Sequence, residues 1–228
     1  MKLLIYHQLL IKAVLVILPW KLKRILLQNI YGYRLDKNSS IGLSWIYPKS
    51  LVMKSGSSIG ALCVAVNLDR IFMDEFSRIG RGNWITGFPT GTESSHFSHQ
   101  MNRKAELSIG KHSAISKNHH IDCTNLIQIG AYTTIAGYRS QFLTHSIDLD
   151  LNRQHSEPIM VGSYCFVGTN SVVLGGSILP DYSVLAAHSL LNKAHSTPWS
   201  IYAGSPATHK KNIDHNSLYF VRQNGFVI

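Results

Sequence analysis

Cysteine is scarce in this chain, with only three thiols among 228 residues, at positions 63, 123 and 165. The number is odd and no two of them form a Cys-x-x-Cys pair, so we expect neither a disulfide framework nor a cysteine-rich zinc site. The scarcity also favours a reducing compartment, and we expect a cytoplasmic protein.

Acidic residues are also few. Twelve Asp and Glu stand against 22 Lys and Arg, which gives a formal net charge of +10 at pH 7. This excess favours an anionic partner, such as nucleic acid, an acidic membrane face or a phosphorylated cofactor. Because the chain shows no recognised nucleic-acid-binding module, we do not expect it to bind nucleic acid.

The first thirty residues contain no acidic residue at all, while they carry the basic residues Lys2, Lys12, Lys21, Lys23 and Arg24. Lys12 interrupts the apolar run, so a membrane-spanning helix is not the first expectation. Two interpretations stay open. The segment is either a helix packed on its own protein or a neighbouring subunit, or an interfacial amphipathic helix whose basic residues meet anionic headgroups at the inner face of a membrane.

A six-residue repeat dominates the second half of the chain. From residue 161 to residue 190 the sequence reads VGSYCF VGTNSV VLGGSI LPDYSV LAAHSL. The first position is always aliphatic and the fifth is always small. The aliphatic positions are Val161, Val167, Val173, Leu179, Leu185 and Leu191, and the small ones are Cys165, Ser171, Ser177, Ser183 and Ser189. Six residues advance an α-helix by about 600°, which would scatter these aliphatic residues around its axis. A three-sided β-solenoid, with one short strand and one corner per hexad, places them all inside.

Ile-Gly dipeptides extend the repeat upstream. They begin at Ile41, Ile59, Ile79, Ile109 and Ile129, and the first interval is eighteen residues, one full turn of such a solenoid. The intervals after Ile79 and Ile129 are 30 and 32 residues long. We therefore expect two loops outside the coil, around residues 88–107 and 141–160, and long loops in a compact domain are commonly functional.

These repeats resemble those of the hexapeptide-repeat acyltransferases, whose fold is a left-handed parallel β-helix. The resemblance implies an all-β, three-sided solenoid with an N-terminal helical segment and protruding loops. It predicts a helical or amphipathic segment over residues 1–38, a β-helix acyltransferase domain over 39–213 and a C-terminal tail over 214–228. The hand of the helix is taken from this resemblance, because parallel crossovers are otherwise right-handed in nearly all proteins.

The resemblance also implies a catalytic histidine. Sugar O-acetyltransferases of this kind carry a Thr-Ala-x-His or similar sequence before a loop, and here the sequence Phe-Leu-Thr-His ends at His145. An alcohol attacks a thioester only when a base of near-neutral pKa takes its proton, which suits an imidazole. Asn118 and Asp122 resemble the family's acceptor-binding residues. Asp148, Glu157 or a backbone carbonyl could orient the imidazole of His145.

A coenzyme site is implied by the small-residue corners that follow. The matching positions are Gly168 and Thr169, then Ala187 and Ser189, and the basic residues Lys193 and Lys211 are expected to meet phosphate, with Lys210 beside the latter. Ser205 stands where the family has Asn, and Thr208 where Arg is common. The implied cosubstrate is acetyl-coenzyme A, and no metal is expected.

The remaining histidines allow an alternative interpretation. His119 or His120, together with His145 and His155, could form a three-histidine metal site like that of the β-helical carbonic anhydrases, so a metal-bearing or non-enzymatic β-helix is the second hypothesis. His96 and His99 could line the acceptor site or lie exposed in the first loop.

The function implied by the resemblance is O-acetyl transfer from acetyl-coenzyme A to a sugar hydroxyl, in the synthesis of a bacterial capsule, O-antigen or exopolysaccharide. The substrate would be a sugar or glycan precursor. A homotrimer is expected, because the aliphatic residues point inward and a single flat outer wall offers little concavity for substrates.

Overall fold

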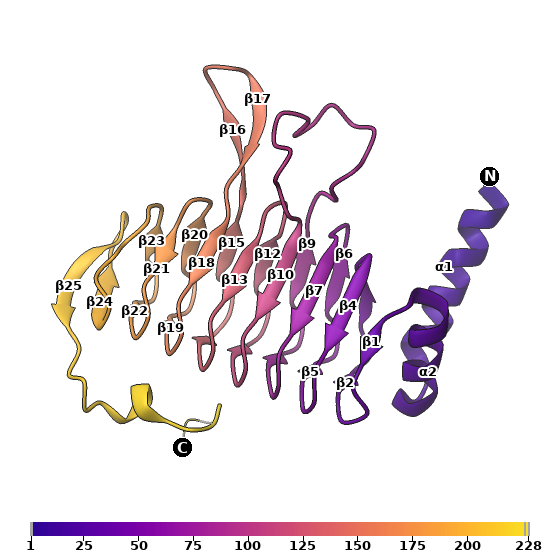
Figure 1. Cartoon of the computed structure of the whole chain (residues 1–228), viewed down its shortest axis with the longest axis horizontal. Helices are drawn as coiled ribbons and strands as arrows, with labels where there is room; N and C mark the ends of the chain where they lie inside the picture. The colour runs from indigo at the N-terminus through magenta and orange to yellow at the C-terminus, as the bar shows by residue number, and fades with distance from the viewer. Residues whose placement is uncertain (1, 226, 228) are drawn as a thin grey trace.

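Residues 2–225 and 227 are described by the computed structural model, which is a three-sided parallel β-helix with two helices at its N-terminal end (Figure 1). Met1, in the predicted N-terminal segment, and residues 226 and 228, in the predicted tail, lie outside the described residues. The coils stack along the long axis of the molecule, and each coil contributes one short strand to each of three faces.

The first face is a seven-stranded sheet of β1 (Arg34–Leu35), β4 (Ser50–Met53), β7 (Arg70–Met73), β10 (Glu106–Ile109), β13 (Ile127–Ile129), β18 (Ile159–Val161) and β21 (Ile178–Leu179). The second face has nine strands, β2 (Ser40–Ile41), β5 (Ser58–Ile59), β8 (Arg78–Ile79), β11 (Ala114–Ile115), β14 (Thr134–Ile135), β19 (Phe166–Val167), β22 (Val184–Leu185), β24 (Ser200–Ala203) and β25 (Thr208–Asn212). The third face has seven, β3 (Trp45–Tyr47), β6 (Val64–Val66), β9 (Trp84–Thr86), β12 (His120–Asp122), β15 (Gln141–Leu143), β20 (Val172–Leu174) and β23 (Leu190–Leu191).

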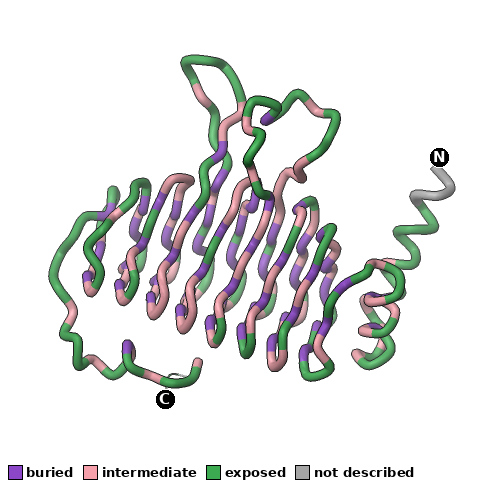
Figure 2. The backbone as a smooth tube through the Cα atoms, in the orientation of Figure 1, coloured by how far each residue is buried: buried purple, intermediate pink, exposed green. Residues whose placement is uncertain are grey.

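The hexapeptide pattern is confirmed as the pattern of burial. Each of the six aliphatic residues from Val161 to Leu191 is at most 3% exposed, and the small fifth residues are buried with them. Figure 2 shows this as a regular alternation of buried and partly buried segments along the coils. The core is therefore one continuous column of inward-pointing side chains.

Close stacking of the coils explains the small residues at the corners. A Cβ atom on Gly168 would lie 2.4 Å from the backbone nitrogen of Ala187 in the next coil, so the glycine is required by space. The buried hydroxyl of Ser171 donates to the carbonyl oxygens of Gly168 and Ala186, at 3.0 and 3.2 Å. Small polar residues at the fifth position thus satisfy backbone groups that the corner would otherwise leave unpaired.

The predicted N-terminal helical segment consists of α1 (Lys2–Ile17) and α2 (Trp20–Tyr31), joined at Leu18 and Pro19. Leu15 and Leu27 join the hydrophobic core and cover the open end of the coil. The middle of α1 projects from the body, and its apolar residues Tyr6, Leu10 and Val14 are exposed (Figure 1). Within residues 2–225 and 227, the structure has no helix with the length and apolar character needed to cross a bilayer.

Lys23 corrects one part of the sequence-based expectation. The interfacial-helix interpretation placed all five basic residues at anionic headgroups, but Lys23 is 3% exposed and its Nζ donates to the carbonyl oxygen of Gly42 at 2.9 Å. Burial lowers the pKa of this ammonium group to about 8. Lys23 therefore binds α2 to the end of the coil and is not available to a membrane.

The C-terminal tail lies along the corner between the first and second faces. Stacked rings of successive coils form a column there, with centroids 4.6 Å apart for Tyr132 and Tyr164 and 4.4 Å apart for Tyr182 and Trp199. The guanidinium of Arg222, just after the 3₁₀ helix η1 (Leu218–Val221), covers Tyr219 and lies over Tyr164. The tail therefore packs along this column of stacked rings.

Candidate active site

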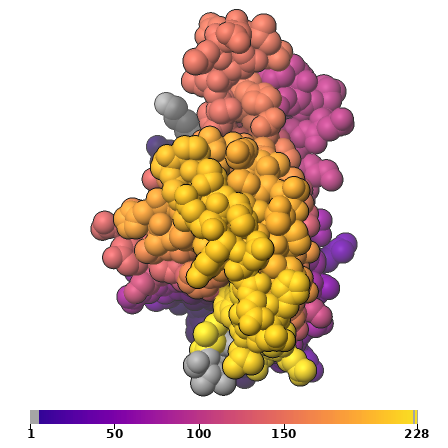
Figure 3. All heavy atoms as spheres, turned by 90° about the vertical axis from the view of Figure 1, so that its left-hand side faces the viewer, coloured from indigo at the N-terminus to yellow at the C-terminus, as the bar shows by residue number. Residues whose placement is uncertain are grey.

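Two segments leave the coil at the corner between the third and first faces. One is the loop of residues 88–104, and the other is a hairpin of β16 (His145–Asp148) and β17 (Arg153–Ser156). Both outgrowths stand above the body side by side (Figure 3). The sequence placed them at 88–107 and 141–160; the structure makes both shorter, because β10, β15 and β18 complete the coil on either side.

Direct hydrogen bonds hold the loop against the hairpin. The amide nitrogen of Gln100 donates to the carbonyl oxygen of Ser156 at 2.9 Å, and the Ser156 hydroxyl donates to the amide oxygen of Gln100 at 2.8 Å. Asn125, on the coil corner between them, donates to the same carbonyl of Ser156 at 3.2 Å. The two outgrowths therefore form one unit with the coil beneath them.

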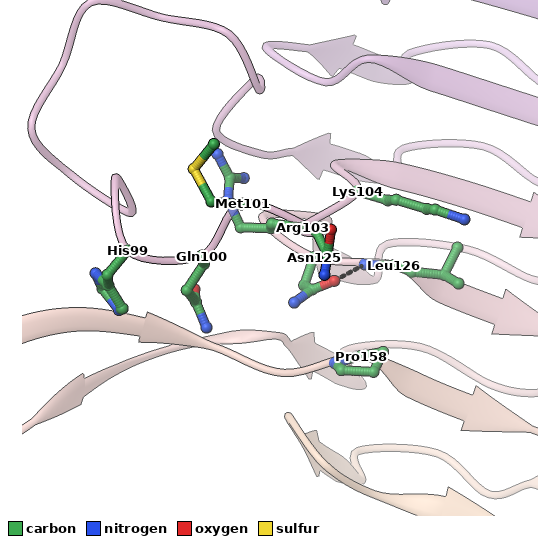
Figure 4. Close-up of a pocket in the computed structure, with 9 residues that line it drawn as sticks. His99, Gln100, Met101, Arg103, Lys104, Asn125, Leu126 and Pro158 are labelled. Carbon is green, nitrogen blue, oxygen red and sulfur yellow. Dashed lines mark hydrogen bonds between the residues drawn. The ribbon is translucent and has the colours of Figure 1, made fainter.

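Arg103 fixes the root of the loop. Its guanidinium donates to the carbonyl oxygens of Phe88, Pro89 and Thr124, and its carbon lies 4.6 Å from the ring centroid of Phe97. On the first-face side, a cavity of about 460 Å³ opens beside it, with Lys104, Asn125 and Pro158 on its wall (Figure 4). The buried ring of Phe97 lies between the guanidinium of Arg103 and the imidazole of His145 on the hairpin.

His145 is the first residue of β16 and lies outside the buried aliphatic series, as the sequence predicted. Its exposed imidazole meets the edge of Phe97, with ring centroids 5.5 Å apart. It lines a cavity of about 390 Å³ on the third-face side of the outgrowths, together with Phe88, Phe97, His120 and Asp122. This space is called the His145 cavity below.

The side chain that contacts the imidazole of His145 is that of Gln154. The two carboxylates considered from the sequence make other contacts. His145 Nε2 donates to the side-chain oxygen of Gln154. Asp148 instead pairs with Arg153 at 3.4 Å, and Glu157 lies 3.8 Å from His155. Gln154 escaped the sequence analysis because it pairs in register with Ile147, two residues from His145, a relation visible only once the hairpin register is known.

Asp122, one of the two predicted acceptor residues, lies beside His145. Its Oδ2 accepts the backbone N–H of His145 at 3.0 Å, and its Oδ1 accepts both the N–H and the hydroxyl of Thr124, at 3.0 and 2.7 Å. The carboxylate therefore faces the His145 cavity and also anchors the first residue of the hairpin.

Asn118, the other predicted acceptor residue, is not brought to this cavity. It lies at the opposite end of β12, on the corner between the second and third faces, with a positive φ of 55°. The three residues of β12 alone span about 7 Å at ~3.3 Å per residue, and Asn118 lies beyond their first residue. The predicted acceptor pair is thus divided between the two ends of one strand.

The predicted coenzyme residues also occupy more than one edge. Gly168, Thr169 and Ala187 follow one another on the corner between the second and third faces, where His188 N–H donates to the carbonyl of Thr169 at 3.0 Å. Ser189 is buried and its hydroxyl accepts the N–H of Gly204.

The two predicted phosphate-binding lysines lie elsewhere and are exposed. Lys193 lies on the corner that carries His145, and Lys211 lies in β25 on the second face. A single chain does not bring these six coenzyme residues into one cavity.

The histidines of the alternative metal site, His119 or His120 with His145 and His155, are not grouped as metal ligands, although His120 and His145 both line the His145 cavity. His119 is buried inside the coil, where Ser140 N–H donates to its Nδ1 at 3.1 Å, and burial lowers its pKa to about 4. His155 lies near Gln100 and Glu157 on the hairpin. Among the residues that the structure describes, no group of three His, Cys, Asp or Glu side chains is arranged to hold a metal ion.

Comparison with known proteins adds the hand and type of the fold. No protein-family model matches the chain, and no curated protein matches it. Among solved structures, it is similar to a hexapeptide-repeat acetyltransferase of Vibrio cholerae complexed with acetyl-coenzyme A, at 24% identity, over 61% of this chain and 69% of that one, with a TM-score of 0.50. It is also similar to the polysialic acid O-acetyltransferase OatWY, at 16% identity, over 82% and 90% of the two chains, with a TM-score of 0.57.

These similarities confirm the predicted fold. The chain has the left-handed parallel β-helix of the hexapeptide-repeat acetyltransferases, with an N-terminal helical segment and protruding outgrowths.

The role of Asp122 as an anchor can be tested by hydrogen exchange. In Asp122→Ala, the His145 and Thr124 amides lose their acceptor, at a cost of about 1–3 kcal/mol for such a group. We expect the exchange rate of the His145 amide to rise by roughly tenfold or more while the coil amides keep their protection.

Asp148→Ala is the matched control, because it removes a partly exposed ion pair on the same hairpin and should leave that amide nearly unchanged. Equal exchange rates at His145 in the two variants would show that Asp122 is not the anchor.

Proposed function

We propose that this chain transfers an acetyl group from acetyl-coenzyme A to a sugar hydroxyl, with His145 as the general base. The observation that carries the proposal is the placement of an exposed imidazole at the wall of a cavity of about 390 Å³, between two linked outgrowths of the coil. Similarity to an acetyltransferase that was solved with acetyl-coenzyme A supports the choice of donor.

The contact with Gln154 supports one division of roles between the two imidazole nitrogens. An amide oxygen can only accept, so in this proposal Nε2 carries the hydrogen that points to Gln154 and Nδ1 accepts the proton of the sugar hydroxyl. The hydroxyl oxygen attacks the thioester carbonyl carbon, the carbon–sulfur bond breaks, and the proton passes from Nδ1 to the leaving thiolate. Asp122 holds the backbone of His145 during this exchange.

The acceptor in this proposal is a sugar of a surface polysaccharide or its precursor. The His145 cavity combines the aromatic rings of Phe88 and Phe97 with the polar groups of Thr86 and Asp122, a mixture that suits a ring with both apolar and hydroxyl-bearing sides. OatWY, one of the similar structures, is an O-acetyltransferase of polysialic acid, which supports a polysaccharide acceptor.

The coenzyme in this proposal lies between neighbouring subunits of a homotrimer. Gly168, Thr169 and Ala187 on one corner, and Lys193 on the other, border the third face, and a second subunit would close the open side of this surface. Backbone groups of the small residues would bind the pantetheine arm, and Lys193 or Lys211 would meet phosphate as a compact charge.

Peripheral membrane association is a further part of the proposal. The projecting part of α1 exposes apolar side chains on several sides, and the segment carries basic residues and no acidic ones. A lipid-linked acceptor at the inner face of the membrane would then lie near the enzyme.

Replacing His145 by alanine tests the general base. We expect His145→Ala to keep the melting temperature of the native protein and to lose about 10²- to 10⁴-fold in the rate of acetyl transfer, measured as coenzyme A thiol released in the presence of a saccharide. His155→Ala, on the same hairpin, should retain near-native rates. A His145→Ala protein that keeps more than about a third of the native rate would refute the assignment.

Light scattering tests the assembly. A mass of three chains is expected for the active protein, because the proposed coenzyme groove needs the wall of a second subunit. An active monomer would contradict this arrangement.

A short truncation tests the membrane proposal without opening the coil. Removing residues 2–11 spares Leu15, Leu27 and Lys23, which close the core, and spares Lys12, whose carbonyl accepts the hydroxyl of Tyr47. We expect the truncated protein to acetylate a soluble acceptor normally and to lose cosedimentation with anionic vesicles at low salt. Native protein that stays in the supernatant at low salt would exclude the membrane proposal.

A further inference from the structure

Trp84 presents a large apolar surface that the proposed reaction does not use. It is the first residue of β9 on the third face, and its side chain is 53% exposed. An indole is large and rigid, so the exposed part of this ring offers a ligand more apolar contact area than almost any other side chain could.

The surroundings of Trp84 are polar and form a cavity of about 450 Å³. In register, Trp84 pairs with His120 and His120 pairs with Gln141, so the three side chains form a row across three coils. Asn118, Arg139 and Asn170 border the row from the adjoining corner. This space is called the distal cavity.

The composition of the distal cavity matches the chemistry of a sugar ring. A pyranose has a face of C–H groups, which packs on an indole, and a rim of hydroxyl groups, which bond to planar amides and guanidinium groups. Trp84 supplies the first surface, and Gln141, Asn118 and Arg139 supply the second. Among the described residues that line this cavity there is no carboxylate, so an acidic sugar would also be tolerated.

The distal cavity adjoins the His145 cavity. His120 lines both, and the two cavities lie at opposite ends of the same three strands, β9, β12 and β15. Each of these strands has three residues, which span about 7 Å at ~3.3 Å per residue. One or two glycosidic links would bridge that separation.

We propose that the distal cavity binds sugar units of an oligosaccharide acceptor, next to the unit whose hydroxyl is presented to His145. The inference rests on the proposed function and gives it a substrate class: a chain of several sugars is preferred over a free monosaccharide. Binding at the distal cavity raises the effective concentration of the reacting hydroxyl in the His145 cavity.

Glycan binding provides a test that does not depend on catalysis. An array of mono- to hexasaccharides identifies a ligand for the native protein, and the affinity of that ligand is then measured for Trp84→Ala, Trp84→Phe and Phe76→Ala. Phe76 is the matched control, since it is half exposed on the corner opposite the third face. We expect about tenfold weaker binding in Trp84→Ala, equivalent to about 1.4 kcal/mol, and near-native binding in the other two.

Three results would overturn the proposal. The native protein could bind no glycan on the array; Trp84→Ala could bind as tightly as the native protein; or Trp84→Ala could change the molecular mass in light scattering, which would make Trp84 a subunit contact.

The kinetics of acetyl transfer distinguish a failure of this inference from a failure of the proposed function on which it rests. For a saccharide that the native protein acetylates, Trp84→Ala should lower kcat/KM about tenfold for the tetrasaccharide and leave the monosaccharide unchanged. Equal losses for both lengths would contradict the distal cavity as a sugar site. Absence of acetyl transfer to any saccharide, with the glycan-binding difference intact, would contradict the proposed function and leave the binding site standing.

Discussion

The spacing between successive coils constrains every other feature of this molecule. Parallel strands lie about 4.8 Å apart, so each corner must fit its backbone within that distance of the corner in the next coil. Gly168 illustrates the limit, because a single added carbon would collide with Ala187. Aliphatic residues fill the interior, small residues pass the corners, and only the outward positions are free to vary.

Side chains at the outward positions form straight rows across successive coils, and two of these rows line the candidate site. Because the register is fixed, Trp84, His120 and Gln141 align at one end of the third face, and Thr86, Asp122 and Leu143 align at the other. The two outgrowths leave the coil at the second of these ends, where Asp122 holds the backbone of His145. A regular scaffold thus supplies rigid support for the irregular and partly exposed segment that carries His145.

The loop and hairpin depend on each other for their positions. Gln100 and Ser156 exchange hydrogen bonds, and Phe97 lies between Arg103 and His145. The cavity beside His145 therefore has one wall from each outgrowth and a floor from the coil. Its shape is set by side-chain contacts between segments some fifty residues apart in the sequence.

The sequence predicted the coil well because the hexad reports a local and repeated constraint. The aliphatic and small positions from Val161 to Leu191 are buried as expected, and His145 lies in the outgrowth where the motif placed it. Contacts between segments could not be predicted in this way. The carboxylates considered for the imidazole are used elsewhere, and Gln154 reaches it through a hairpin register that no Asn-Gly or similar turn signalled.

The N-terminal segment shows the same limit. Of the two interpretations that its sequence left open, the interfacial helix would place all five basic residues at a membrane surface, yet Lys23 points inward to the carbonyl of Gly42. The sequence pattern of a helix that closes a coil differs little from that of a helix that lies on a membrane, because both need an apolar side and solvated lysines. Leu15 and Leu27 pack against the end of the coil. That end exists only in the folded protein, so the sequence pattern alone could not distinguish the two kinds of helix.

The proposed reaction is acyl transfer to a saccharide at the His145 cavity. Mass spectrometry of native protein incubated with acetyl-coenzyme A and a panel of sugars, nucleotide sugars and glycolipid precursors tests it most directly. We expect at least one saccharide to gain a single acetyl group while an equal amount of coenzyme A is released. An intact thioester in the presence of every saccharide, or cleavage at the same rate without any saccharide, would contradict it.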